Sequence, residues 1–220
     1  NVRKLNINNY KFKGIRLVDY YDSRRWEKEK QFFNPDNHYV FPGMIYFENI
    51  PGCPIAYWAS ENVIKSFDNL IGQKFQAVAG ISTGKNEAYI FSWFEINYND
   101  IGFKANMDSK FRPHSKGGEF RKWYGNRDYI IKYNRNTLEE MRKLPGFRHD
   151  GNQYYFKNLL SWSKVTSSMF SVRYYDPCFV FDSAAPALYS DSIEYNLLGY
   201  LNSKLPNYFM QIINPTMNYP

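Results

Sequence analysis

The distribution of hydrophobic and polar positions along the chain changes near residue 50. Before this point the chain is polar and interrupted: the charged segment Asp22–Phe33 predicts one short helix, and two prolines predict a loop over Asn34–Gly43. Beyond it, apolar runs bounded by turn residues become frequent. The pattern therefore predicts an extension over residues 1–49 and a folded domain over residues 50–220.

Short apolar runs in the second part predict β-strands, because Gly, Pro, Asn and Ser bound them. These runs are Ile55–Trp58, Lys74–Gly80, Ala88–Ile96, Tyr129–Tyr133, Leu159–Val165, Phe170–Tyr174 and Phe179–Phe181. Capping residues and apolar spacing predict helices from Ser60 to about Leu70, from Thr137 to about Lys143, over Tyr195–Lys204 and over Pro206–Ile213. Strands and helices do not alternate regularly. The chain therefore predicts a mixed α+β fold with a strand-rich core and peripheral helices, rather than a doubly wound parallel sheet.

Composition narrows the class of protein. Hydrophobic residues make up 44% of the 220 residues, which is too many for a disordered chain. No run reaches the ~18 apolar residues that a transmembrane helix needs, and no signal peptide is visible. The two cysteines, far apart and without a C-x-x-C motif, predict neither a disulfide scaffold nor a zinc site and favour the cytoplasm. Because the chain starts without Met and stops just after a motif, we interpret it as a fragment.

The positive charge is concentrated in one segment. The chain carries a formal net charge of +7, and Lys110–Arg135 holds eight basic and two acidic residues, a net +6. Aromatic residues such as Trp123 and Tyr124 are interleaved with these cations. Lys and Arg neutralise phosphates and release counterions, so the segment has what a nucleic-acid contact requires. Charge alone leaves a solvated basic surface with structural aromatics equally open.

Two further segments are candidates for anion contact. Ser161–Ser168 and Phe170–Tyr174 place short hydroxyl side chains beside Lys164 and Arg173, although an ordinary hairpin with turn-forming serines fits as well. Gly80–Asn86 superficially resembles a phosphate loop but lacks its spacing, which excludes nucleotide hydrolysis. A turn that donates backbone N–H groups to an anion remains open there.

Catalytic signatures are weak in this sequence. It contains no H-E-x-x-H motif, and Gly80–Gly84 (G-I-S-T-G), although its letters fit G-x-S-x-G, is not expected to form a nucleophile elbow. His38, His114 and His149 are expected in loops rather than as general bases, and Glu139 with Glu140 is expected on a solvated helix. Paired glycosidase carboxylates stay open, because they carry no local motif. The sequence therefore predicts no catalytic, metal-binding or cofactor-binding residue in this chain.

Several segments together resemble one family, the adenine-specific DNA methyltransferases of bacterial phage-exclusion (BREX) systems. The segments, in the family's order, are Pro51–Trp58 (P-G-C-P-I-A-Y-W, with Cys53 where Ser is expected), Gly80–Asn86, Lys116–Asn126, Ser161–Lys164, Phe170–Tyr174, Leu197–Lys204 and Asn214–Tyr219. The resemblance implies that the stretch follows the methyltransferase domain and acts as its target-recognition region. Residues 1–49 are then expected to be an N-terminal extension, either a linker from that domain or a part of the recognition domain.

The family's catalytic motif, [N/D/S]-P-P-[Y/F/W], does not occur here. Asn34-Pro35 continues as Asp36, and Asn214-Pro215 continues as Thr216. The resemblance therefore implies a fragment that is not catalytic alone and binds no cofactor, within a parent enzyme that uses S-adenosylmethionine. The implied partners are duplex DNA, the parent's methyltransferase domain and other phage-defence proteins, with no membrane.

The resemblance selects the DNA-contact candidates. Arg121, Lys122 and Arg127 are expected to bind phosphates or guanines, while Trp123 and Trp162 are expected to anchor the loops. The other expected DNA-binding residues are Lys85, Asn86, Lys116, Tyr124, Asn126, Lys164, Thr166, Ser167 and Arg173. Three rival functions remain: a single-strand or RNA binder, an aromatic-rich carbohydrate-binding or hydrolysing domain, and a scaffold for protein partners.

Overall fold

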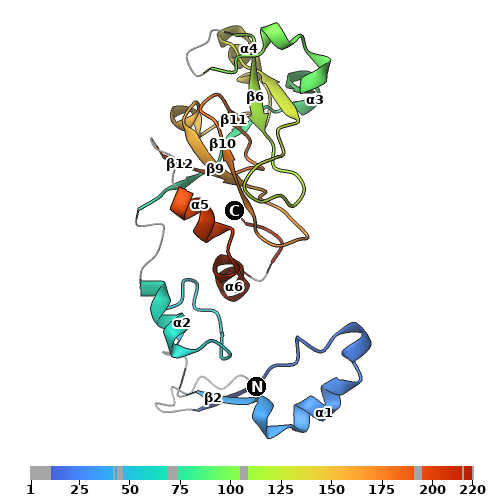
Figure 1. Cartoon of the computed structure of the whole chain (residues 1–220), viewed down its shortest axis with the longest axis vertical. Helices are drawn as coiled ribbons and strands as arrows, with labels where there is room; N and C mark the ends of the chain where they lie inside the picture. The colour runs from blue at the N-terminus through green and yellow to red at the C-terminus, as the bar shows by residue number, and fades with distance from the viewer. Residues whose placement is uncertain are drawn as a thin grey trace. The chain divides into compact units, whose positions relative to one another are not determined.

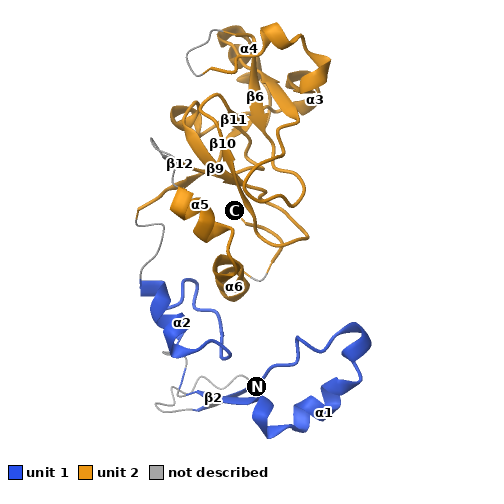
Figure 2. Ribbon diagram, viewed as in Figure 1, with its two compact units in different colours: residues 1–70 blue, residues 71–220 orange. Residues whose placement is uncertain are grey.

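The structure, a computed structural model, describes residues 11–41, 43, 47–68, 74–104, 109–190, 195–214 and 216–219. It divides into two compact units, residues 1–70 and 71–220 (Figure 2). Part of the expected extension, the end of the helix expected up to Leu70, and Pro215 of the last motif lie outside the described residues. The domain boundary predicted between residues 49 and 50 differs from the division into compact units after residue 70, and it stays a prediction.

Unit 1 begins with an antiparallel pair of strands, β1 (Phe12–Ile15) and β2 (His38–Phe41). Helix α1 (Glu27–Phe33) lies within the segment expected to be helical, which opens with a 3-10 turn, η1 (Asp22–Arg24). The loop expected over residues 34–43 is wrong at β2. Pro35 opens a second short turn, η2 (Pro35–Asn37), and the four residues after this turn pair with β1.

The strand expected over Ile55–Trp58 is also wrong. The chain turns there instead, because the N–H of Ala56 donates to Pro54 O (2.8 Å) and that of Ala59 donates to Ala56 O (2.9 Å). Tyr57 reaches back to β1, where its hydroxyl donates to Ile15 O (3.0 Å). Helix α2 (Glu61–Lys65) then follows with the expected cap, since Ser60 Oγ accepts from the Val63 N–H, and a 3-10 turn, η4 (Ser66–Asp68), extends it.

Unit 2 contains two four-stranded sheets among its described residues (Figure 1), with strand orders β10-β9-β12-β3 and β11-β6-β7-β5. The first sheet consists of β3 (Ala77–Val78), β9 (Asn158–Trp162), β10 (Val172–Tyr175) and β12 (Ala187–Ser190). The second consists of β5 (Ile90–Ser92), β6 (Phe111–Ser115), β7 (Tyr129–Lys132) and β11 (Val180–Phe181). A smaller pair joins β4 (Ile81–Ser82) to β8 (Arg148–His149).

The helices of unit 2 are α3 (Asn86–Tyr89), α4 (Arg135–Met141), α5 (Tyr195–Leu201) and α6 (Lys204–Ile213). Single 3-10 turns are η6 (Trp93–Glu95), η7 (Tyr98–Asp100) and η8 (Asn152–Tyr154). Strands and helices mix without regular alternation, so the predicted α+β class is confirmed. No helix in the described part of the chain has the length and apolar character needed to cross a membrane.

Strand β9 of the first sheet is covered on both faces, which explains why four of its five residues are buried. Successive residues of a strand point to opposite faces. Leu159 packs with Tyr175 and Phe181 in one cluster, whereas Leu160 packs with the buried Leu198 of α5 in another. Both faces of β9 are therefore buried, and helix α5 provides the cover on one side.

Two predicted helix boundaries are wrong for a local reason. Asn134, not Thr137, caps α4: its Oδ1 accepts from the Thr137 N–H (2.9 Å), and Thr137 is buried inside the helix. The break between α5 and α6 falls before Pro206, which lies inside the first turn of α6. Ser203 caps that helix, since its Oγ accepts from the Leu205 N–H (3.3 Å). Proline in a first turn loses no intrahelical bond, so it does not break the helix.

Candidate nucleic-acid interface

The middle of the basic segment Lys110–Arg135 is a long hairpin connection, residues 116–128, which has four basic and two acidic residues and which we call the basic loop. It joins β6 to β7 in one sheet and extends to β10 at the edge of the other (Figure 1). There the Trp123 N–H donates to Val172 O (3.0 Å), and Trp123 O accepts from the Tyr174 N–H (3.0 Å). The loop therefore extends the first sheet by one residue and is fixed at its tip.

The backbone of the basic loop adopts left-handed conformations at several positions. Gly117 has φ +80°, and a Cβ there would lie 3.1 Å from Ala184 O, so the position suits glycine. Trp123 has φ +71° and Asn126 has φ +54°. Asn tolerates this region, but for a bulky aromatic residue it costs about 1–3 kcal/mol. The two bonds to β10 hold Trp123 in this unfavourable conformation.

Arg173 supports the loop from inside the protein. Its side chain is fully buried in β10, and its guanidinium donates to Arg121 O (3.3 Å), Ser163 Oγ (3.1 Å) and Tyr175 Oη (3.3 Å). The expectation that Arg173 contacts DNA does not fit this geometry, since a buried guanidinium cannot reach a phosphate. Arg173 instead holds the backbone of the basic loop.

Arg127 and Lys122 also point inward. The Arg127 guanidinium pairs with Asp176, donates to Tyr174 O (2.9 Å) and lies 3.9 Å from the centre of the Tyr124 ring. Lys122 Nζ donates to Asn202 O (2.6 Å) just after α5. Asn126 is buried, and its Nδ2 donates to Glu119 O (2.9 Å) inside the loop. These three expected DNA contacts are engaged in holding the loop together.

Other side chains of the basic loop remain at the surface. Arg121 is exposed and Lys116 is half-buried, with its Nζ 4.9 Å from the centre of the Tyr129 ring. Three aromatic side chains accompany them: Phe120 is 38% exposed, Trp123 is 51% exposed and Tyr124 is 65% exposed. Trp123 is therefore not the buried anchor that the sequence predicts.

The structure brings the second predicted segment against the first. Ser163 Oγ donates to Gly118 O (2.7 Å), so the segment after β9 touches the basic loop. Lys164 is half-buried and Ser167 is exposed, while Thr166 Oγ1 accepts from the Ser168 N–H (3.0 Å). The sequence did not indicate that residues 216–219 return to this segment.

The return of the C-terminal segment explains why Trp162 is buried. Tyr219 O accepts from Trp162 Nε1 (2.9 Å), and the Thr166 N–H donates to Met217 O (3.0 Å). Trp162 is 6% exposed, as expected of an anchor. The aromatic residues Trp162 and Tyr219 were the sequence signal that could have indicated this contact between the second segment and the C-terminal segment.

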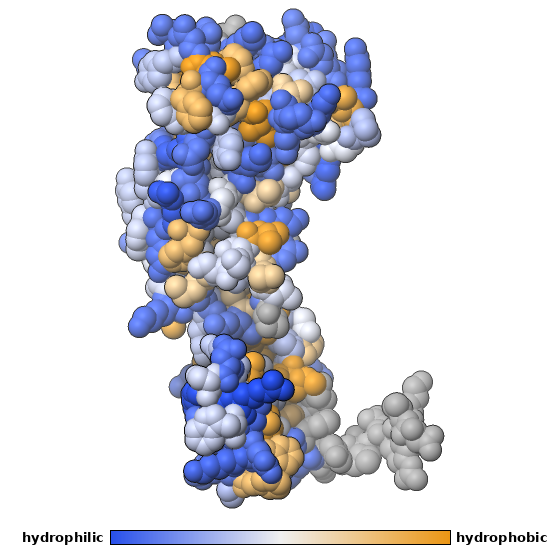
Figure 3. Space-filling view, turned by 90° about the vertical axis from the view of Figure 1, so that its right-hand side faces the viewer, coloured by the Kyte–Doolittle hydropathy of each residue, from blue (hydrophilic) through white to orange (hydrophobic). Residues whose placement is uncertain are grey.

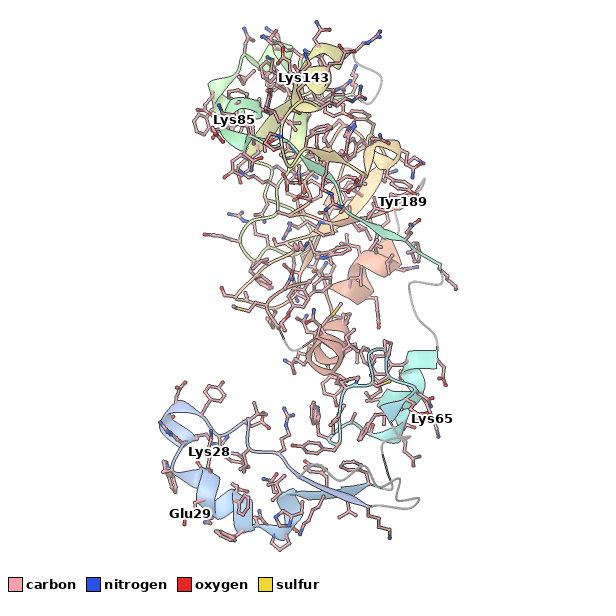
Figure 4. All side chains as sticks on the ribbon, turned by 180° about the vertical axis from the view of Figure 1, so that it is seen from behind. Lys28, Glu29, Lys65, Lys85, Lys143 and Tyr189 are labelled. Carbon is pink, nitrogen blue, oxygen red and sulfur yellow. The ribbon has the colours of Figure 1, made fainter. Side chains whose placement is uncertain are left out.

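Lys85 and Asn86 belong to a different part of unit 2. Their turn packs against residues 144–147, where a Cβ on Gly84 would lie 2.9 Å from Pro145 O. Figure 4 accordingly shows Lys85 and Lys143 at the same end of the unit. Inside the turn the buried Thr83 donates to Asn86 Oδ1 (2.7 Å) and accepts from the Lys85 N–H (3.2 Å). The turn therefore uses its own polar groups locally.

The three histidines lie in strands rather than in the expected loops: His38 in β2, His114 in β6 and His149 in β8. His114 is fully buried, with one ring nitrogen 3.0 Å from Val180 O and the other 3.3 Å from Asp182 Oδ2. Burial alone would raise the pKa of Asp182, but the bonds from His114, the Ala184 N–H and Ser183 hold it below its ordinary value. The pair joins β6 to the segment after β11.

His149 makes stability depend on pH. Burial, and secondly the nearby Arg142, lower its pKa, while Asp150 opposes them, and its Nε2 lies 3.0 Å from Tyr133 Oη. Below the ordinary His pKa of about 6.5 the unfolded chain then binds more protons than the folded chain. We expect the thermal midpoint to fall from pH 7.5 to pH 5.5, and His149→Gln to reduce this fall. An equal fall in both proteins, measured by circular dichroism, would contradict the assignment.

Comparison with known proteins shows which class of protein this chain resembles. No family model matches the chain. Over nearly its whole length, however, the chain is similar to one part of adenine-specific methyltransferases. It is 34% identical over 215 residues to adenine-specific methyltransferase BrxX of Escherichia coli O9:H4 (strain HS). It is 32% identical over 226 residues to adenine-specific methyltransferase PglX of Lacticaseibacillus casei (strain Zhang).

These matches cover 96% and 93% of this chain but 17% and 19% of the two relatives. The chain therefore spans less than a fifth of the length of these curated relatives. It is homologous to a segment of BREX adenine-specific methyltransferases, and the resemblance drawn from its motifs is confirmed.

Proposed function

We propose that this chain is the DNA-recognition segment of an adenine-specific, S-adenosylmethionine-dependent DNA methyltransferase of a phage-defence system. The observation that carries the proposal is the fixed basic loop. Its inner cations hold the loop between two sheets, while Lys116 and Arg121 remain at the surface, and Ser163, the neighbour of Lys164, touches the loop. The loop also exposes the acids Glu119 and Asp128, but cations presented from a fixed loop suit the phosphates of duplex DNA.

The proposal divides the expected contacts into two groups. Lys116, Arg121, Tyr124, Lys164 and Ser167 present side chains to DNA, with Lys116 and Arg121 on phosphates. Lys122, Asn126, Arg127 and Arg173 position the loop. Thr166 shapes the second segment through its bond to the Ser168 N–H. Lys85 and Asn86 would contact DNA only where a long duplex passes both ends of the unit.

Two pockets among the described residues give little support for an S-adenosylmethionine site. The first, of about 400 Å³, is lined by Arg112, Arg135 and Arg142 with the single acid Glu139, a net positive lining that disfavours a sulfonium. A second pocket, of about 340 Å³, is lined by the polar turn around Lys85 and lacks the apolar walls typical of cofactor sites. We therefore assign the cofactor to the parent's methyltransferase domain and no cofactor to this segment.

The remaining parts of the proposal concern the parent protein. Residues 1–49 would link this segment to the methyltransferase domain, and residues 50–220 would form the recognition domain. The parent would act in the cytoplasm, where its partners would be duplex DNA and other phage-defence proteins. The relatives' names support the methyltransferase part alone.

Salt dependence of DNA binding tests the proposal. The chain is titrated into fluorescently labelled random-sequence duplex between 50 and 200 mM salt, and binding is measured by anisotropy. We expect affinity to fall steeply with salt. The double variant Lys116→Ala/Arg121→Ala should bind roughly tenfold more weakly, with a log–log slope shallower by roughly two, because two phosphate contacts are lost.

The matched control removes two exposed cations elsewhere in unit 2. Arg135→Ala/Lys143→Ala changes the net charge equally, and Arg135 is 93% exposed on α4. If both double variants lose the same affinity and slope, general charge attraction explains binding and the interface is wrong. The exposed aromatics favour single-strand binding as a second candidate function, so an unlabelled single strand is included as competitor. Stronger competition by the single strand than by duplex would select that alternative.

A further inference from the structure

Trp123 combines three properties in one residue. Its backbone has φ +71°, a conformation that bulky side chains rarely adopt. Its main chain is bonded on both sides to β10, through the N–H to Val172 O and through the carbonyl from the Tyr174 N–H. Its side chain is nevertheless 51% exposed. The structure thus enforces an unusual backbone to hold a large apolar ring at the surface.

The surroundings of this ring indicate what it would touch. Phe120 and Tyr124 are also exposed, and Lys116 and Arg121 of the same loop are the outward cations. The loop also exposes the acids Glu119 and Asp128, and its two outward cations together with the aromatic tip match a ligand with phosphates outside and flat, stackable surfaces inside. Duplex DNA has this arrangement, but its base faces become accessible only where a base step opens.

The support beneath the ring fits a wedge better than a flexible contact. The buried Arg173 donates to the carbonyl of Arg121, two residues before Trp123. Lys122, the residue directly before Trp123, donates through Nζ to Asn202 O. Pushing an aromatic ring between stacked bases requires a rigid base, since a mobile loop would deflect. Separate small groups of hydrophobic side chains appear on the face of unit 2 in Figure 3. Neither exposure nor backbone alone singles out Trp123, since Phe156 also has a positive φ, of +62°. Trp123 combines the two properties, whereas Phe156 is half-buried.

We propose that Trp123 is a stacking wedge, which enters an opened base step of duplex DNA while the outward cations of the basic loop hold the phosphates. This inference rests on the proposed function and assigns a role to one residue within it. The ring stabilises unstacked DNA regardless of which base is displaced, because every base has a π-face. Its role is positioning, and it reads no sequence.

A duplex with a ready-made gap tests the wedge. The probes are a labelled 12-base-pair duplex and the same duplex with one abasic site. We expect the chain to bind the abasic duplex about tenfold more tightly, because the ring fills the gap without paying for unstacking. Trp123→Gly, which accepts φ +71° and removes the ring, should bind both probes equally with an unchanged salt slope. Trp123→Phe should restore most of the preference.

Trp93 supplies a control of equal exposure. It is 53% exposed in η6 of the same unit, without a left-handed backbone, and Trp93→Ala should keep the preference for the abasic duplex. Equal affinity of the unaltered chain for both probes would overturn the wedge while leaving the proposed function intact, as would loss of preference in Trp93→Ala. Failure to bind either probe at 50 mM salt would instead overturn the proposed function. Thermal midpoints of all variants check that the fold is retained.

Discussion

Gly80→Ala is expected to destabilise the fold more than any other single methyl group added at the glycines described above. A Cβ at residue 80 would lie 1.8 Å from Phe181 O and 2.4 Å from its carbonyl carbon. Both are backbone atoms of β11, so a side-chain rotation cannot relieve the overlap. Gly80 directly precedes β4, and a shift of β4 or of β11 would disturb the hydrophobic cluster that contains Ile81 and Phe181. We expect a loss of about 4 kcal/mol, or a fall of about 10 °C in the thermal midpoint.

Gly199→Ala is the matched control for this substitution. Gly199 lies in α5, and apart from its chain neighbours and the helix's own backbone no heavy atom lies within 4 Å of the position of its added Cβ. Alanine in a helix is more stable than glycine by about 0.5–1 kcal/mol, so the midpoint should rise slightly. A Gly80→Ala protein that melts within 2 °C of the unaltered chain would show that β4 and β11 are not packed as described.

Arg173→Lys is expected to loosen the basic loop although the charge is kept. A lysine ammonium cannot reproduce the guanidinium fork that bonds Arg121 O, Ser163 Oγ and Tyr175 Oη, and its charge would stay buried. We expect a loss of about 2–3 kcal/mol in the free energy of unfolding, measured by chemical denaturation. The loop itself offers trypsin sites at Arg121 and Lys122, and cleavage there should become about tenfold faster.

Arg148→Lys provides the comparison for the Arg173 substitution. The Arg148 side chain is 64% exposed and pairs with Asp150, so its exchange should change stability by at most about 0.5 kcal/mol. Unchanged stability together with unchanged trypsin cleavage in Arg173→Lys would remove Arg173 as the support of the loop.

The sequence predicted elements well where local pattern and burial agree. The strands near Tyr129, Leu159 and Phe179 and the short helix before Asn34 were found, because apolar runs and capping residues specify them directly. It missed β6, whose residues Phe111–Ser115 include Arg, Pro and His but are all buried. Arg112 is accommodated in this strand because the carbonyls of Gly102 and Lys104 accept its hydrogen bonds, and His114 because Val180 O and Asp182, distant in sequence, lie against its ring nitrogens.

The candidate nucleic-acid interface could also be predicted only in part from the sequence. Charge clustering located the basic loop and hydroxyl clustering located the second segment, and the bond between Ser163 and Gly118 joins the two. The sequence could not tell which cations face outward. Arg121 and Arg173 are equally basic as letters, but one is exposed and the other fully buried, and only the position of each in the fold decides this.

The way in which the basic loop is attached has a consequence for evolution. The inward side chains of Lys122, Asn126 and Arg127 make part of its fixing bonds, but at the outward positions these bonds are made by backbone atoms: the N–H and carbonyl of Trp123 and the carbonyls of Gly118, Glu119 and Arg121. A peptide group is the same in almost every residue, so these bonds survive a change of the side chain above them. The outward positions can therefore exchange their side chains while the loop keeps its place. A lineage can acquire a new surface chemistry there without rebuilding the scaffold.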